Sequence, residues 1–187
     1  GKRLSARKAV VSAIGLKDTL LDLVGADHLS PYTQRRAKNF KEGPDQVLGS
    51  VAMALHEPPK YKSARWDPGI DRAWYQVVGY DSAKDVLDYC RAGHSDRVPE
   101  LPAAAVWVNS LWDATQAPPG KHNLTGWYFF PKASALSEAE WEAVRVSYND
   151  RFLKLFGEFA PNMTRKNVIA DSLHTPLDQE RGMRMRE

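Results

Sequence analysis

The chain has 187 residues, of which 43% are hydrophobic and 26% charged, a balance typical of one globular domain with a sizeable core. Its formal net charge of +3 is too small to indicate a nucleic-acid partner. Cys90 is the only cysteine, which excludes an intrachain disulfide, argues against a cysteine-based metal site and predicts a reducing, cytoplasmic compartment. No apolar run has the length of a membrane span.

The first forty residues predict one short strand and two helices. Val10-Val11 indicates a buried strand with no earlier strand to pair with, and we expect both ends of the chain to continue into a longer protein. The alternative is a complete small protein. A helix is predicted over Leu16–Val24 and ends at Gly25, as helices commonly end at glycine. A second, polar helix over Tyr32–Phe40 begins after Pro31, which suits a first helical turn.

The segment Gln46–His56 alternates as a strand does, with period two. One face holds Leu48, Ser50, Ala52, Ala54 and His56, and the other holds Val47, Gly49, Val51, Met53 and Leu55. The first face is made mainly of small residues, which let a helix or a ligand approach the sheet closely; a packed helix is the commoner case. Pro58-Pro59 ends this strand, because proline cannot continue a sheet ladder.

The middle of the chain predicts three more strands and a helix. Ala73–Tyr80 is rich in aromatic and β-branched residues and predicts a strand. Ser82–Gly93 predicts a helix with a serine N-cap, whose apolar side includes Cys90; we expect that thiol to be buried in the core. Pro102–Trp112 and Asn123–Phe130 predict two strands, joined by a loop whose length suits an antiparallel hairpin.

A long amphipathic helix is predicted after Ser137, where Ser137 and Glu140 form a capping box. An apolar stripe then repeats at helical spacing and ends before Pro161; it consists of Trp141, Val144, Tyr148, Phe152, Leu155, Phe156 and Phe159. A last strand is predicted over Asn167–Ser172. Hairpin-like pairs dominate, so we predict an α+β fold, a mainly antiparallel sheet with helices packed on one face.

The sequence contains no GxGxxG fingerprint, no HExxH and no GxSxG, and its five histidines are scattered. It therefore assigns no catalytic, cofactor-binding or metal-binding residue. Its aromatic content is more informative: six Trp, seven Tyr and six Phe, several crowded into the predicted hairpin. A well-packed core explains this pattern most simply. The functional interpretation is a slot for an apolar, flat or elongated molecule.

Five stretches, in this order along the chain, resemble the phytoene-desaturase-like FAD oxidoreductases, a branch of the amine-oxidase-type flavoproteins. They are Ala6–Ala13, Val51–Pro59, Ser110–Asp113 followed by Ala117–His122, Phe159–Asn162, and Thr175–Arg181. The turn Ala-Pro-Pro-Gly-Lys-His at 117–122 is the most specific of them.

The resemblance implies that residues 1–14 end a strand of an FAD domain, residues 15–174 form the substrate-binding domain, and residues 175–187 return toward the FAD domain. FAD would be held by portions of the same enzyme outside this chain, which would be inactive alone. The substrate would be an apolar small molecule, and we predict that it contacts His56, Trp107, Trp112, Trp127 and Phe129. The segment His174–Pro176 would lie nearest the flavin, as a hinge or domain junction.

Two alternatives remain open from the sequence. One is a free-standing, aromatic-lined binding module without redox activity. The other is a lobe that mediates assembly, either as a homo-oligomer or through peripheral contact with a membrane. Basic residues near both ends of the chain and the polar helix Tyr32–Phe40 suit the second alternative, although a solvated surface explains them equally well.

Overall fold

The computed structural model describes residues 5–40 and 46–183. The chain divides into two compact units, residues 1–42 with 184–187, and residues 43–183. The larger unit thus begins later than the predicted substrate-binding domain, 15–174, because the helices before residue 40 pack with one another. A side-chain hydrogen bond from Gln34 Nε2 to the Ala26 carbonyl, at 2.7 Å, joins two of these helical segments.

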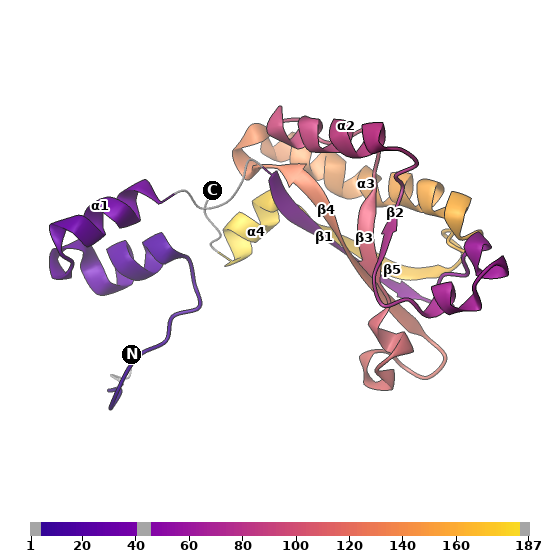
Figure 1. Ribbon diagram of the computed structural model, residues 1–187, viewed down its shortest axis with the longest axis horizontal. Helices are drawn as coiled ribbons and strands as arrows, with labels where there is room; N and C mark the ends of the chain where they lie inside the picture. The colour runs from indigo at the N-terminus through magenta and orange to yellow at the C-terminus, as the bar shows by residue number, and fades with distance from the viewer. Residues whose placement is uncertain (1–4, 41–45, 184–187) are drawn as a thin grey trace. The chain divides into compact units, whose positions relative to one another are not determined.

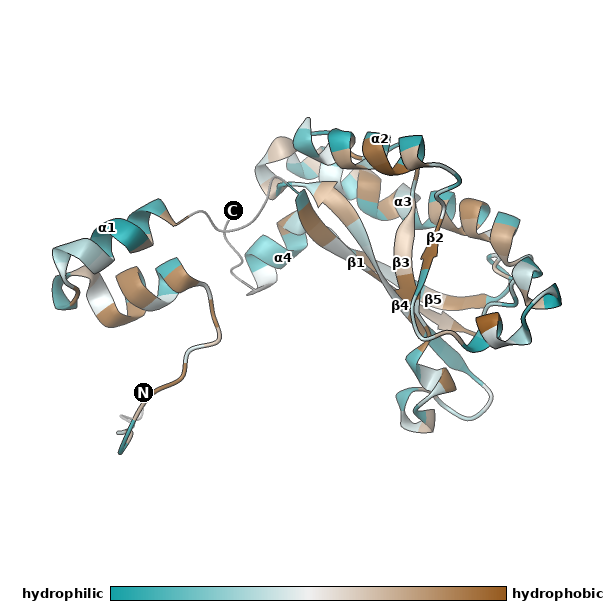
Figure 2. Ribbon diagram, viewed as in Figure 1, coloured by the Kyte–Doolittle hydropathy of each residue, from teal (hydrophilic) through white to brown (hydrophobic). Residues whose placement is uncertain are grey.

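The smaller unit contains η1 (Asp18–Gly25), η2 (Ala26–His28) and α1 (Pro31–Asn39). Both predicted helices are present, and Ser30 caps α1 by accepting a hydrogen bond from the Thr33 amide at 3.1 Å. Helix α1 is polar along most of its length (Figure 2). The buried strand expected at Val10-Val11 is not formed in this chain: these side chains are 85% and 91% exposed. A lone strand has no partner for its backbone hydrogen-bonding groups.

The larger unit is built on a five-stranded sheet in the order β2-β3-β4-β1-β5, with every neighbouring pair antiparallel. The strands are β1 (Gln46–Leu55), β2 (Gln76–Val78), β3 (Ala104–Trp107), β4 (His122–Pro131) and β5 (Val168–His174). The helices are η3 (Lys62–Arg65), η4 (Pro68–Arg72), α2 (Ala83–His94), η5 (Asn109–Leu111), η6 (Ala114–Gln116), η7 (Ala133–Ala135), α3 (Glu138–Phe159) and α4 (Pro176–Met183). The α+β prediction is confirmed, with α3 across one face of the sheet (Figure 1).

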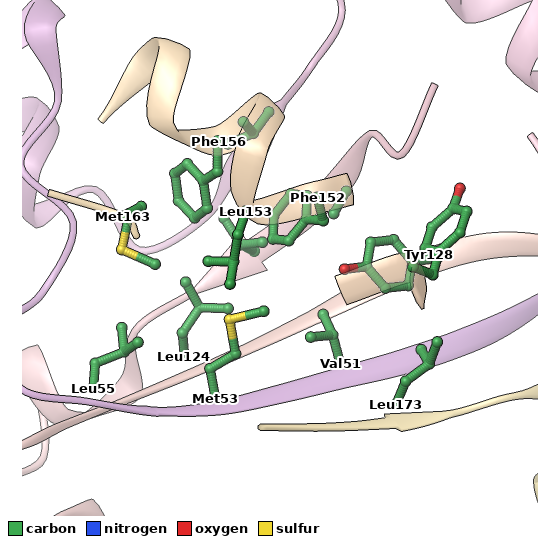
Figure 3. Close-up of a cluster of buried hydrophobic side chains, with 14 of the residues drawn as sticks. Val51, Met53, Leu55, Leu124, Tyr128, Phe152, Leu153, Phe156, Met163 and Leu173 are labelled. Carbon is green, nitrogen blue, oxygen red and sulfur yellow. The ribbon is translucent and has the colours of Figure 1, made fainter. Parts of the chain in front are cut away.

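The core lies between α3 and the sheet face that carries Val51, Met53 and Leu55 (Figure 3). The predicted capping box is present: Ser137 N donates to Glu140 Oε2 at 2.7 Å, and Glu140 N donates to Ser137 Oγ. Four members of the predicted stripe are fully buried, namely Trp141, Tyr148, Phe152 and Phe156. The first three pack against Tyr128 or Phe130 of β4, and Phe156 packs against Phe152. The aromatic stripe of α3 and the core face of the sheet therefore form one packed layer.

Helix α2 is oriented differently from the prediction, which placed Cys90 in the core. Cys90 is exposed, and Val86 and Leu87 are also exposed on α2. The buried side chain is Tyr89, whose hydroxyl donates to the Ala103 carbonyl at 3.1 Å and accepts from the Phe129 amide at 2.8 Å. Ala103 directly precedes β3, and Phe129 lies on β4 beyond its last residue paired with β3, Trp127. The Tyr89 hydroxyl therefore bridges two backbone groups where the β3–β4 ladder has not yet begun.

Two predicted strand boundaries also differ. Of the strand predicted over Ala73–Tyr80 only β2 forms, and of Pro102–Trp112 only β3 forms before the chain turns into η5. Helix α4 was not predicted. It begins with a capping box of its own: Thr175 N donates to Asp178 Oδ2 at 2.8 Å, and Asp178 N donates to Thr175 Oγ1 at 3.3 Å.

On the core face of β1, Gly49 lies so close to the Phe130 ring that no larger side chain fits. A Cβ at Gly49 would stand 2.4 Å from two ring carbons of Phe130, a distance that real Cβ contacts do not reach. We predict that Gly49→Ala lowers the free energy of unfolding by about 1–3 kcal/mol, the usual cost of overpacking a core. Urea unfolding measures this loss. Gly182→Ala is the control, because a Cβ there meets no atom within 4 Å; equal effects of the two substitutions would contradict the packing argument.

Candidate functional site

The sheet face opposite α3 carries small side chains on β1 and β5. Ser50, Ala52 and Ala54 on β1 lie directly across from His174, Ser172 and Ala170 on β5, and we call these six residues the small-residue strip. All six are exposed except Ser50, which is half-buried. In the described residues 46–183 no helix covers the strip, so the helix expected on this face does not come from the larger unit. The strip is free to contact another molecule or another part of a larger protein.

Aromatic side chains border the small-residue strip on the side of β4. Trp107 and Trp127 meet edge to face, with ring centroids 4.8 Å apart, and Tyr75 stacks on Trp107 at 6.2 Å. Phe129 follows Trp127 on the same face of β4, because side chains two residues apart in a strand point to the same side. Trp127 and Phe129 are each 40% exposed and Tyr75 is 52% exposed. We call these four residues the aromatic wall.

A single row of side chains crosses the whole face. Its members face one another strand by strand: Val77, Ala105, Trp127, Ser50 and His174. Neighbouring strands lie about 4.8 Å apart, so the row spans roughly 19 Å. Apolar and aromatic groups therefore occupy one half of the face, and hydroxyl, methyl and imidazole groups occupy the other. An apolar molecule that lies on the wall would have polar groups within reach on the strip side.

His56 lies at the end of the small-residue strip, one residue beyond β1 and on the same side as Ala54. Its Nδ1 atom is 2.9 Å from Lys121 Nζ. An ammonium group can only donate, so Nδ1 accepts this hydrogen bond and the imidazole proton is on Nε2. Lys121 is half-buried, and among residues 5–40 and 46–183 it forms no ion pair with a carboxylate. The two side chains form a cationic end to the strip.

A hydrogen-bonded turn holds the loop that carries Lys121. Ser110 Oγ lies 3.1 Å from His122 Nδ1, the Ser110 amide donates to Asn123 Oδ1 at 3.0 Å, and the Asn123 amide donates to Ser110 Oγ. Burial lowers the pKa of His122, which keeps this imidazole neutral near pH 7. Because the Ser110 and Asn123 amides each donate to the other residue's side chain, the network joins η5 to the start of β4. We assign it a positioning role.

The structure thus brings together three of the five residues predicted to bind substrate. Trp107, Trp127 and Phe129 belong to the aromatic wall, and His56 lies at the end of the strip. Trp112 is separate: it follows η5 outside the sheet, is 58% exposed, and its ring faces the Arg72 guanidinium at 5.5 Å. The sequence analysis missed Tyr75, although it shares a strand face with Val77 within the predicted segment Ala73–Tyr80, and that alternation could have identified it.

A groove of about 640 Å³ lies between α3, β5 and α4, lined by Arg145, Asn149, Asp171, Ser172, Leu173, His174, Asp178, Gln179 and Gly182. Its charged groups are paired with one another or with neighbouring residues. Arg145 Nη2 donates to Asp178 Oδ1 at 2.6 Å, and Asp171 accepts hydrogen bonds from Arg165 and from Asn149. This polar network ties β5 and α4 to α3, which gives the groove a structural explanation.

Comparison with protein-family models finds no match to this chain, and no curated protein sequence matches it. The described residues contain no group of three His, Cys, Asp or Glu side chains that could hold a metal ion. Among the helices described in residues 5–40 and 46–183, none combines the length and apolar character needed to cross a membrane.

The cap of α4 predicts a pH dependence of stability. Partial burial would raise the pKa of Asp178, but hydrogen bonds from Thr175 and Arg145 outweigh it and hold that pKa below the usual 3.8. A lowered folded-state pKa stabilises the fold above the unfolded-state value, and this contribution is lost as the pH falls through the folded-state pKa. We expect Asp178→Asn to lower the melting temperature at pH 7 by several degrees, the shift that corresponds to about 1 kcal/mol.

The difference between Asp178→Asn and the wild type should shrink as the pH falls below about 4. Thermal unfolding followed by circular dichroism between neutral and acidic pH measures it. Asp81→Asn, at an exposed aspartate before α2, is the matched control and should show no such trend. If the melting temperature of Asp178→Asn stays below that of the wild type by the same amount at acidic pH, the carboxylate charge does not contribute to stability.

Proposed function

We propose that this chain is the substrate-binding region of an FAD-dependent oxidoreductase of the phytoene-desaturase-like kind, acting on an apolar small molecule. The observation that carries the proposal is the uncovered sheet face, where the aromatic wall borders the small-residue strip. Exposed aromatic rings next to a flat surface of small residues suit an apolar molecule that lies on the sheet. The core behind this face is complete, so the side chains that would meet the substrate are held by a packed layer.

Three of the five stretches on which the resemblance rests lie together in space, which supports reading these three as one structural unit. Asn162, at the end of α3, donates to the Pro58 carbonyl at 2.9 Å and accepts from the Lys60 amide at 2.8 Å. His56, beside the same prolines, contacts Lys121. Three stretches that are far apart in the sequence, 51–59, 117–122 and 159–162, therefore meet at one end of the sheet.

The small-residue strip also fits the neighbourhood of a flavin. Its side chains, apart from His174, are no larger than serine, so a flat ring or its substrate can approach the backbone closely. The sequence has no GxGxxG fingerprint, and the diphosphate of FAD would be held by the FAD-binding portion of the same enzyme, outside this chain. When bound, FAD would supply the acceptor for hydride removal.

The residues of this chain would bind, orient and shield the substrate. Trp107 and Trp127 would pack against its apolar body, and their edge-to-face contact fixes both rings. Covering the face with the flavin-bearing portion would exclude water from the strip. No residue of this chain is assigned a proton-transfer role. A cytoplasmic location, peripheral contact with a membrane and homo-oligomer formation remain predictions from the sequence.

A second candidate function is a binding module without redox activity. The larger unit favours it, because residues 43–183 enclose their own core between α3 and the sheet. Such a unit could bind an apolar ligand on the aromatic wall without any flavin. The two candidates share the same ligand-binding face and differ in whether a flavin covers it.

The proposal predicts that the protein that contains this chain carries a flavin and turns over an apolar substrate through the small-residue strip. We expect Ala52→Trp to raise KM by roughly tenfold, the loss of about 1.4 kcal/mol in binding, with the flavin content unchanged. Val146→Trp is the control, since Val146 is exposed on α3 and faces away from the sheet. Steady-state kinetics and flavin absorbance measure both quantities.

Two results would contradict the proposed function. A protein that purifies without flavin and does not bind it would leave the binding module as the better account. Equal KM values for Ala52→Trp and Val146→Trp would mean that substrate binds away from the strip.

A further inference from the structure

The cationic end of the small-residue strip has chemistry that an entirely apolar substrate would not use. His56 continues the face of Ser50, Ala52 and Ala54, and Lys121 Nζ donates to its Nδ1 atom at 2.9 Å. One donor of the ammonium group is used in this way. Among residues 5–40 and 46–183, the other donors and the Nε2–H of His56 have no hydrogen-bond partner. The strip thus ends at a pair of donors.

Lys121 is half-buried as a residue, its ammonium contact with His56 is exposed, and among residues 5–40 and 46–183 it forms no ion pair with a carboxylate. The imidazole of His56 accepts one hydrogen bond from this ammonium group but carries no negative charge to balance it. Lys60 and Arg165, by contrast, reach Glu57 and Asp171. Lys121 lies beside an exposed surface of small residues, so an anion on a bound molecule can supply the missing charge.

We infer that the uncovered face takes an elongated apolar molecule with a carboxylate at one end, the carboxylate at Lys121 and His56 and the apolar body along the small-residue strip. This inference rests on the proposed function and names the substrate class for the same face. One ammonium group and one imidazole N–H match the two oxygens of a monoanionic carboxylate. Phosphate sites usually supply more donors, from backbone amides or an arginine fork.

The dimensions of the strip set the length of the molecule. Ser50 and His56 are six residues apart along β1, about 20 Å at the rise of a strand. Over that length the side chains are methyl and hydroxymethyl groups, and the aromatic wall stands beside its far half, where Trp127 faces Ser50. An extended acyl or polyene chain reaches both the cationic end and the wall, whereas a compact molecule reaches only one of them.

Isothermal titration calorimetry of the whole chain with laurate and with dodecanol, which differ only in the head group, tests the inference. We expect laurate to bind tighter by roughly tenfold or more, as for one charge-assisted hydrogen bond. Lys121→Met should remove this preference and leave the affinity for dodecanol unchanged. Lys154→Met, at an exposed lysine on α3, is the matched control and should change neither. His56→Gln should weaken laurate binding as an independent second variant.

Ala54→Phe, which fills the strip at an exposed position, should weaken both ligands. Equal affinities of the wild type for laurate and dodecanol, a preference that survives Lys121→Met, or tighter binding of dodecyl phosphate than of laurate would each overturn the carboxylate assignment. If both ligands bind and Ala54→Phe weakens both, the substrate face of the proposed function stands even where that assignment fails. If neither ligand binds, or Ala54→Phe has no effect, both the inference and the proposed substrate face fail.

Discussion

The packing of α3 on one face of the sheet is the constraint on which the rest of the structure depends. Its aromatic stripe contacts Tyr128 and Phe130 of β4, with ring centroids 4.9 to 5.8 Å apart in the closest pairs with Tyr148 and Trp141. Such aromatic pairs add to the free energy of burial and fix the orientation of the rings. Because side chains alternate along each strand, committing one face to α3 determines which residues are left on the other.

Hydrogen bonds and an ion pair fix the elements on both sides of the uncovered face. The Tyr89 hydroxyl joins Ala103, just before β3, to Phe129 of β4, which holds the backbone of Phe129 at a point where β3 has not yet begun. At the opposite edge, the capping box of Thr175 and the ion pair of Arg145 with Asp178 hold α4 directly after β5. The small-residue strip thus lies between two fixed borders. A ligand would meet a surface that is formed before binding, which lowers the entropic cost of association.

Much of the fold follows from local sequence signals, because those signals describe interactions that stay within a few residues. The alternation of Gln46–Leu55, the capping box at Ser137 and the proline pair after β1 all predict what the structure contains. The predictions were wrong where contacts between residues far apart in the sequence determine which side chains are buried. Cys90 is exposed because Tyr89 is needed between β3 and β4, and no local pattern contains that requirement.

The candidate site was predictable in part, for the same reason. Trp107, Trp127 and Phe129 lie in neighbouring strands, and strand period alone places the last two on one face. Lys121 could not be assigned from the sequence, because its role depends on His56, which is 65 residues away and meets it only across the end of the sheet. Trp112 was selected for its residue type, but the chain leaves the sheet at η5 before reaching it.

We propose that the face opposite α3 is a binding surface that the rest of a flavoprotein covers. Cysteine labelling tests it directly, with Ala52→Cys on that face and Val146→Cys on α3, each combined with Cys90→Ser. We predict that both cysteines react with a maleimide in this chain, and that only the cysteine at position 52 becomes protected in the longer protein with its flavin and substrate bound. Equal reactivity of the two positions in that complex would contradict the account.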